Sequence, residues 1–269
     1  MSAIGGALVS RLAEQSMTLL PASNWVNTFQ INLGKRVQRN VLLHHYTSLR
    51  IGGPAMLFGR ARTAAELAQM VIMANRHDVE VLVVDDGQHL LVGDWGFDGF
   101  AMRLEGDFHR LMPDSGGLAV GGACSVGRVL EACLAARLDA MVLAPLHGQI
   151  GAALLRATPR QRDAFEALID RVEIVDEAVR LRSFARLADL PSQALAITRL
   201  QLRGTAILDD AAICDRVEAR RMLMQSRRPQ HPHPGAIFKL EDGRSAASAI
   251  TKVGLAGLCS GQVGIPKNQ

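Results

Sequence analysis

The sequence predicts an α+β protein, because apolar strand segments alternate with amphipathic helices along most of its 269 residues. Strand-like alternation over 44–61 flanks a Gly52-Gly53-Pro54 turn. Thr63 and Glu66 then form a capping box ahead of apolar residues at helical spacing, and this helix is expected to end near His77. Because Val79–Val84 follows as a buried strand, the first lobe is predicted to be a β-α-β unit.

The second half of the chain repeats this mixture of elements. Leu118–Val120 is predicted to be a strand, and Ser125 is placed to cap the helix that follows it. Glycines at 148 and 151 predict a tight turn after that helix. The remaining expected elements are a helix at 161–170, strands at 172–175 and 196–202, and a helix at 210–226.

Composition limits the class of protein. A hydrophobic content of 48% supports a sizeable core, and no run of eighteen apolar residues predicts a membrane span. The N-terminal stretch is broken by Arg11 and Glu14, so no signal peptide is expected and the predicted location is cytoplasmic. The net charge of +4 is too mild and too dispersed for nucleic acid as a partner.

Three residue groups are interpreted as structural. The basic cluster at 216–229 alternates with apolar residues, as on the solvated face of an amphipathic helix. The four cysteines are widely spaced, which favours reduced, mostly buried thiols over disulfides or zinc. His231 and His233 would share a face in an extended segment, but no third ligand follows nearby, so no metal site is predicted.

Four segments, in order, resemble the UDP-N-acetylenolpyruvoylglucosamine reductase family. They are YTSLRIGGPA (46–55), LVVDDGQHLLVGDWGFDGFAMRL (82–104), LAPLHGQIGAALLRA (143–157), and HPHPGAIFK with AITKVGLAGLCSGQV (231–263). The resemblance covers most of the chain, and the second segment is its most specific part.

The resemblance implies a fold and a reaction. Its fold is a two-lobe FAD-binding architecture of the PCMH or vanillyl-alcohol-oxidase type, with a third lobe for substrate. The implied domains are an N-terminal extension (1–40), two FAD-binding lobes (41–113 and 114–205) and a shortened substrate lobe (206–269). In this family NADPH reduces the flavin, which then reduces the enolpyruvyl group of a peptidoglycan precursor.

The family's cofactor-binding turns map onto three stretches of this sequence. The cofactor-binding residues that the resemblance implies are Arg50, Ile51, Gly52, Gly53, Gly87, Gln88, His89, Leu90, Gly148, Gln149 and Gly151.

The sequence also departs from the family where chemistry is needed. Asp85 and Asp86 replace glycines in the turn that wraps the FAD pyrophosphate, and unit charges about 4 Å apart repel by about 4 kcal/mol at an effective dielectric near 20. Ala236 stands where the family has its proton-donating serine, so no catalytic residue is assigned. The family's Tyr-Arg pair is missing, and the sequence ends before the position of its glutamate.

Two functions remain open at this point. The first is a divergent family member with weak or no reductase activity, which acts by binding a nucleotide sugar or an unidentified protein. The alternative is an active flavoprotein reductase of UDP-N-acetylenolpyruvoylglucosamine with an altered cofactor loop. FAD is the cofactor that the resemblance implies, and the carboxylates of Asp85 and Asp86 disfavour its binding. NADPH takes part only if the protein is active.

Overall fold

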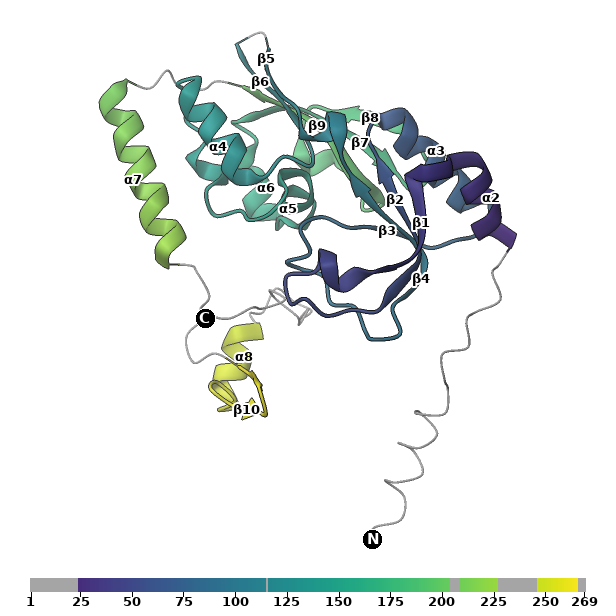
Figure 1. The fold of residues 1–269 in the computed structure, drawn as a ribbon. Helices are drawn as coiled ribbons and strands as arrows, with labels where there is room; N and C mark the ends of the chain where they lie inside the picture. Colours follow the sequence, from purple (N-terminus) through teal and green to yellow (C-terminus); the bar gives the residue numbers. More distant parts are fainter. Residues whose placement is uncertain (1–23, 115, 204–208, 227–245, 266–269) are drawn as a thin grey trace.

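The structure is a computed structural model that describes residues 24–114, 116–203, 209–226 and 246–265. Its central part consists of two β-sheets, each carrying its own helices (Figure 1). The α+β architecture expected from the sequence is confirmed.

The first sheet has the strand order β1-β2-β4-β3. Its strands are β1 (Val37–Leu42), β2 (Pro54–Ala61), β3 (Val81–Val83) and β4 (Phe97–Leu104). β1 pairs antiparallel with β2, whereas β2 and β3 each pair parallel with β4. The expected β-α-β unit is therefore present, with β4 inserted between its two strands.

Two helices supply the apolar cover of the first sheet, α2 (Asn24–Leu33) and α3 (Ala64–Arg76). Phe29 of α2 meets Phe100 of β4 edge to face, with ring centroids 5.0 Å apart. Gly59 of β2 leaves room for that packing, because a Cβ there would lie 2.6 Å from the Phe100 ring. The side chain of Thr63 caps α3 by accepting from the Glu66 amide, but the Glu66 carboxylate accepts from the Arg62 amide at 2.8 Å, so only half of the predicted capping box forms.

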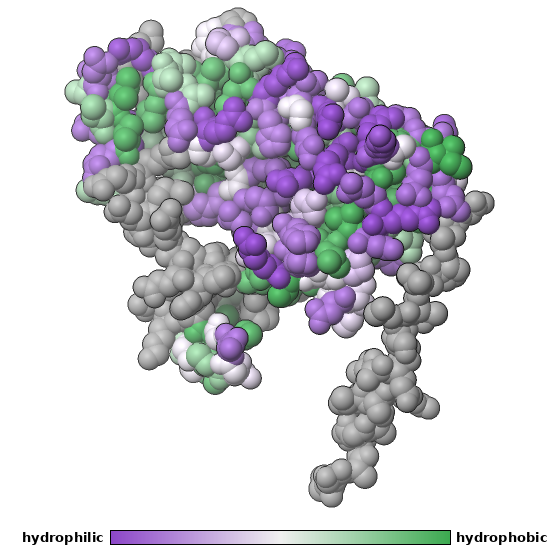
Figure 2. All heavy atoms as spheres, viewed as in Figure 1, coloured by the Kyte–Doolittle hydropathy of each residue, from purple (hydrophilic) through white to green (hydrophobic). Residues whose placement is uncertain are grey.

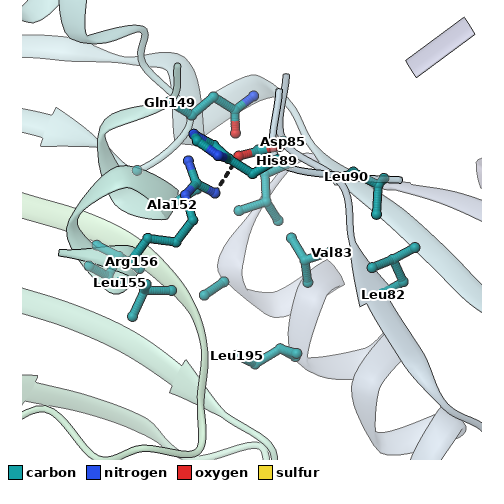
Figure 3. A pocket seen from close by; sticks show the side chains of 14 residues that line it. Leu82, Val83, Asp85, His89, Leu90, Gln149, Ala152, Leu155, Arg156 and Leu195 are labelled. Atoms are coloured by element: carbon teal, nitrogen blue, oxygen red, sulfur yellow. Dashed lines mark hydrogen bonds and ion pairs between the residues drawn. The ribbon is translucent and has the colours of Figure 1, made fainter. Parts of the chain in front are cut away.

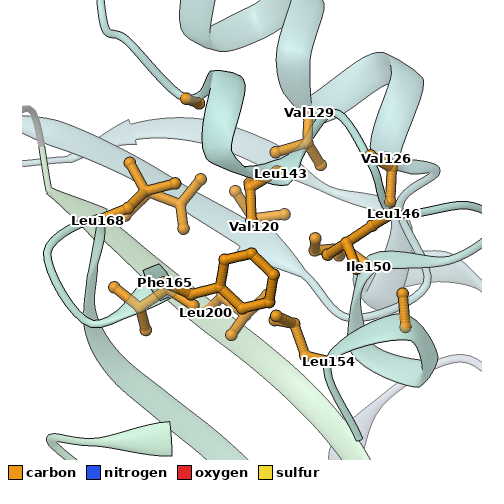
Figure 4. Packing of buried hydrophobic residues seen from close by; sticks show 14 of the residues in the cluster. Val120, Val126, Val129, Leu143, Leu146, Ile150, Leu154, Phe165, Leu168 and Leu200 are labelled. Carbon is orange, nitrogen blue, oxygen red and sulfur yellow. The ribbon is translucent and has the colours of Figure 1, made fainter. Parts of the chain in front are cut away.

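The second sheet is antiparallel, in the order β5-β6-β9-β7-β8. Its strands are β5 (Leu111–Asp114), β6 (Gly117–Gly121), β7 (Ile169–Asp176), β8 (Leu181–Phe184) and β9 (Ala194–Arg203). Three helices pack against it, α4 (Val126–Ala135), α5 (Ile150–Arg156) and α6 (Pro159–Phe165). Figure 4 shows Phe165 and Leu154 from these helices beside Leu200 of β9, and all three side chains are buried.

The two lobes share apolar packing. Val175 and Ala196 of the second sheet belong to the same buried cluster as Met70 and Phe100 of the first lobe. The Asn75 side chain also donates to the Glu177 carbonyl, 2.6 Å away. These contacts hold the two lobes together.

Short 3-10 helices join these elements, and the C-terminal part adds a few more. The 3-10 helices are η1 (Gly34–Arg36), η2 (Leu43–Tyr46), η3 (Gly106–His109), η4 (Met141–Leu143) and η5 (Leu187–Asp189). The C-terminal elements are α7 (Asp210–Ser226), α8 (Ala246–Lys252), β10 (Cys259–Ser260) and β11 (Val263–Gly264). Arg137 and Asp139, which follow α4, form ion pairs with Asp210 and Arg216 of α7.

Hydrophilic residues cover most of the central face in Figure 2, while hydrophobic ones show in smaller groups. In the described part of the chain, no helix combines the length and the apolar composition that crossing a membrane requires.

Several sequence predictions need correction. The strand expected ahead of Gly52 lies earlier, as β1, and His44–Tyr46 falls in η2. The helix expected over 161–170 is α6, which begins sooner because Thr158 forms a complete capping box, and Ile169 already belongs to β7. Gly151 lies in the first turn of α5 rather than in a loop.

The cysteines and the first-lobe strand also differ from expectation. Cys124 and Cys133 are buried, but Cys214 and Cys259 are exposed, so "mostly buried" holds for two thiols of the four. The strand predicted at Val79–Val84 shrinks to β3, whose residues are half-buried because it is an edge strand paired only with β4. The helix over 210–226 is confirmed as α7.

Candidate functional site

A cavity of about 280 Å³ lies between the two lobes (Figure 3). One wall comes from β3, the loop after it and the end of β4; the other comes from α5 and the start of β9. The lining residues are Leu82, Val83, Asp85, His89, Leu90, Leu104, Gly122, Gln149, Ala152, Leu155, Arg156, Leu195, Ala196 and Ile197.

The cavity has an apolar body and one polar end. Figure 3 shows Leu82, Val83 and Leu195 along the body, whereas Asp85, His89 and Gln149 gather at the opposite end beside Arg156. A concave apolar space with a few convergent polar groups is the usual form of a small-molecule site.

An ion pair between the lobes closes the polar end. Arg156 Nη1 of α5 lies 2.7 Å from Asp85 Oδ2 in the loop after β3. The Asp85 side chain is only 12% exposed, and that of Arg156 is 36% exposed. The other oxygen, Asp85 Oδ1, accepts a hydrogen bond from the Gly87 amide at 2.9 Å. Both carboxylate oxygens of Asp85 are therefore engaged.

Asp86 lies where the two glycine turns meet. A Cβ added to Gly148, whose φ is +77°, would lie 2.6 Å from Asp86 Oδ2, so this carboxylate packs directly on the second turn. The Gln88 amide donates to Asp86 Oδ1 over a long 3.5 Å. Burial, followed by the charge of Asp85, raises the pKa of Asp86 above its usual 3.8.

His89 lies at the exposed side of the polar end. Partial burial, and then the positive charge of Arg156, lower the pKa of His89 below 6.5. At neutral pH its imidazole is therefore uncharged and offers one donor and one acceptor.

Gln149 precedes α5 as its N-cap residue and is only 8% exposed. Its carbonyl oxygen accepts from the Ala153 amide, but its side chain does not cap the helix. Among the residues that the structure describes, the Gln149 side-chain amide has no hydrogen-bond partner. Buried amides are normally paired, so this one marks a place where a polar ligand or water belongs.

The other predicted cofactor residues have close backbone contacts of their own. A Cβ on Gly87 would lie 1.9 Å from the Tyr46 carbonyl oxygen, and one on Gly53 would lie 2.0 Å from that of Asp94. The Gly53 amide donates to the Gly93 carbonyl at 2.9 Å. These glycines are required by the packing of first-lobe loops, with or without a ligand.

The structure thus brings only part of the predicted set together. His89, Leu90 and Gln149 line the cavity, while the Arg50–Gly53 turn packs against the loop at Val92–Asp94. Ala236 and the His231–Pro234 segment lie outside the described residues. The sequence analysis missed Arg156, which lies 71 residues from Asp85 and has no sequence signal that links the two.

The residues at the polar end do not fit the pyrophosphate of FAD. Phosphate-binding turns offer free backbone amides, but the amides of Gly87 and Gln88 already donate to the side chains of Asp85 and Asp86. An incoming pyrophosphate would meet two carboxylates in their place.

The fold defines the class of protein: a two-lobed α+β protein with the architecture of a solved reductase. A crystal structure of UDP-N-acetylenolpyruvylglucosamine reductase (MurB) from Thermus caldophilus superimposes with a TM-score of 0.64, covering 87% of this chain and 89% of that one at 23% identity. No family model matches the sequence.

Curated sequences lead to the same family. The chain is 29% identical to UDP-N-acetylenolpyruvoylglucosamine reductase 2 of Symbiobacterium thermophilum over 82% of its own length and 75% of that protein. It is 25% identical to the reductase of Heliobacterium modesticaldum over 85% of its length and 76% of that protein. The resemblance seen in the sequence is confirmed: the chain is a divergent homologue of UDP-N-acetylenolpyruvoylglucosamine reductases.

Proposed function

We propose that this chain is a divergent relative of UDP-N-acetylenolpyruvoylglucosamine reductase with weak or no reductase activity. The observation that carries the proposal is the polar end of the cavity, where Asp85 and Asp86 occupy the amides that an FAD pyrophosphate would need. Weak flavin binding follows from these occupied amides. Weak or absent reductase activity follows in turn, because the reaction implied by the family needs that cofactor.

The size of the electrostatic effect supports the proposal. A phosphate oxygen about 4 Å from one of these carboxylates is repelled by about 4 kcal/mol at an effective dielectric near 20. At about 1.4 kcal/mol for each factor of ten, that repulsion lowers affinity by roughly a thousandfold. Arg156 offsets part of the charge of Asp85, but its guanidinium is already committed at 2.7 Å.

The residues on the catalytic side support the same conclusion. By the resemblance, Ala236 stands at the serine that donates a proton, and a methyl group has no proton to give. Tyr46, the only tyrosine, stacks on Phe58 with ring centroids 4.5 Å apart, and its hydroxyl accepts from Arg60 at 3.1 Å. It is therefore engaged within the first lobe and does not replace the family's Tyr-Arg pair.

The test is oxidation of NADPH by the full chain with added FAD and UDP-N-acetylenolpyruvoylglucosamine. The reductase of Symbiobacterium thermophilum serves as the control under identical conditions. We expect turnover by the control and, for this chain, no NADPH consumption above the protein-free rate. Stoichiometric NADPH oxidation with formation of the reduced sugar would establish the alternative, an active reductase with an altered cofactor loop.

One observation favours that alternative. Gly148 keeps its positive φ of +77° in the second turn, so the backbone course of that turn does not itself exclude a cofactor.

If the chain is not an enzyme, it acts by binding, and the partners that follow are a nucleotide sugar or a protein. The cytoplasmic location also stays a prediction.

A further inference from the structure

The cavity between the lobes is large enough for a compact ligand. An apolar cavity of roughly 150 Å³ holds benzene. At about 280 Å³, this cavity has room for a molecule of two fused rings. Pockets for drug-sized ligands occupy about 300–1,000 Å³, so the space lies just below that range.

The walls of the cavity suit a flat apolar body. Leu82 and Val83 approach from the first lobe, and Leu155, Leu195 and Ile197 from the second. None of these side chains carries a polar atom, so a ring between them is held by dispersion and by exclusion of water.

The residues that line the polar end carry no unbalanced charge that would select an ion. Asp85 is paired with Arg156 at 2.7 Å, and the lowered pKa of His89 leaves its imidazole uncharged at neutral pH. Asp86 lies behind this end, against Gly148, and opposes any anion. These groups favour a neutral ligand.

Gln149 supplies the recognition element. The residue is more than nine-tenths buried and lines the cavity, and its side-chain amide has no partner among the described residues. Figure 3 shows it at the polar end, across from the apolar body of the cavity. A primary amide presents one donor face and one acceptor face, so its complement is a group with an adjacent N–H and C=O.

We propose that the cavity binds a small neutral heterocycle of two fused rings with a lactam edge, whose N–H and C=O pair with the Gln149 amide. This inference rests on the proposed function, because it assigns the inter-lobe space to a ligand other than FAD. The rings lie between the leucines of the two lobes, and the lactam edge faces the Asp85–Arg156 pair.

The experiment uses quinolin-2(1H)-one as the probe, titrated into the full chain by isothermal calorimetry. Quinoline is the matched compound, since it has the same rings without the N–H and C=O pair. We expect saturable binding of the quinolinone and affinity at least about tenfold weaker for quinoline. This comparison needs no variant and is independent of any effect on folding.

Two variants locate the site. Gln149→Leu keeps the size of the side chain and removes its amide, so it should weaken quinolinone binding about tenfold. Quinoline binding should weaken less, because quinoline has only its ring nitrogen to accept from that amide. Gln69→Leu makes the same change on the exposed face of α3 and should alter neither affinity. Thermal unfolding of both variants checks that they are folded.

The outcomes separate this inference from the proposed function. No saturable quinolinone binding, or equal affinities for wild type and Gln149→Leu, would overturn the inference. Retention of FAD, measured separately, would overturn the proposed function. Quinolinone binding that depends on Gln149 and is displaced by FAD would support the ligand site at Gln149 and would contradict the proposed function.

Discussion

Replacing Arg156 with glutamine tests how much the ion pair between the lobes contributes to the stability of the fold. The change removes the guanidinium that lies 2.7 Å from Asp85 Oδ2 and leaves that carboxylate with the Gly87 amide. Breaking a fully buried pair costs about 3–5 kcal/mol, whereas exposed pairs contribute about 0.2–1 kcal/mol. Asp85 is 12% exposed and Arg156 is 36% exposed, so a loss of about 2 kcal/mol is expected.

Thermal and urea unfolding of the purified variant measure this loss. For a chain of this size, about 2 kcal/mol corresponds to a fall in Tm of about 4–8 °C. Arg203→Gln is the matched control, because it breaks an ion pair with Asp170 in which both side chains are about half exposed. That control should change the free energy of unfolding by less than about 1 kcal/mol.

A double variant completes the cycle. Asp85→Asn combined with Arg156→Gln removes both charges, so most of the lost stability should return, because no uncompensated carboxylate remains. An Arg156→Gln protein as stable as the control, or a double variant as unstable as the sum of its single changes, would refute the assignment of Asp85 as a buried partner.

Three further predictions concern a glycine, a carboxylate and the cysteines. Gly148→Ala should destabilise the fold by more than about 1–2 kcal/mol, since it adds a close contact with Asp86 to the penalty of a positive φ. Gly34→Ala is the control, because it carries only the φ penalty, and equal losses of stability on urea unfolding would contradict the contact with Asp86. Asp86→Asn should stabilise the protein at pH 7, because the raised pKa of the Asp86 carboxyl means that its ionised form weakens the folded state. The gain in unfolding free energy should shrink as the pH falls toward 3.8, and a gain that does not change with pH would contradict this reasoning. A thiol reagent at pH 8 should modify the exposed Cys214 and Cys259 rapidly in the native protein. Cys133 should not react, because burial raises the pKa of its thiol to about 12, and equal reaction rates for all four cysteines would contradict this burial pattern.

Local sequence signals predicted the elements well where a single side chain sets them. Thr63 and Ser125 each accept from an amide three residues ahead, and α3 and α4 begin directly after them. The strand at Leu118–Val120 and the helix over 210–226 follow from periodicity alone. These features depend on neighbours along the chain, so one sequence is sufficient to find them.

The site depended on contacts that no local pattern encodes. The sequence placed Asp85 and Asp86 in the phosphate-side turn, but not the guanidinium of Arg156, 71 residues away. Ile197 was predicted only as part of the strand at 196–202, and Leu195 was left just outside it, because an apolar residue beside a cavity has the same periodicity as one in the core. Tertiary packing alone decides which of these side chains borders open space.

Retention of FAD by the full chain tests most directly whether Asp85 and Asp86 exclude the cofactor. Purified protein is incubated with excess FAD, desalted, and examined for the visible flavin absorption band, with the reductase of Symbiobacterium thermophilum treated in parallel. We expect this chain to emerge colourless, because Asp85 and Asp86 accept from the amides of the turn that we propose would face the pyrophosphate. About one retained flavin per chain would contradict it and show that the turn rearranges to admit the cofactor.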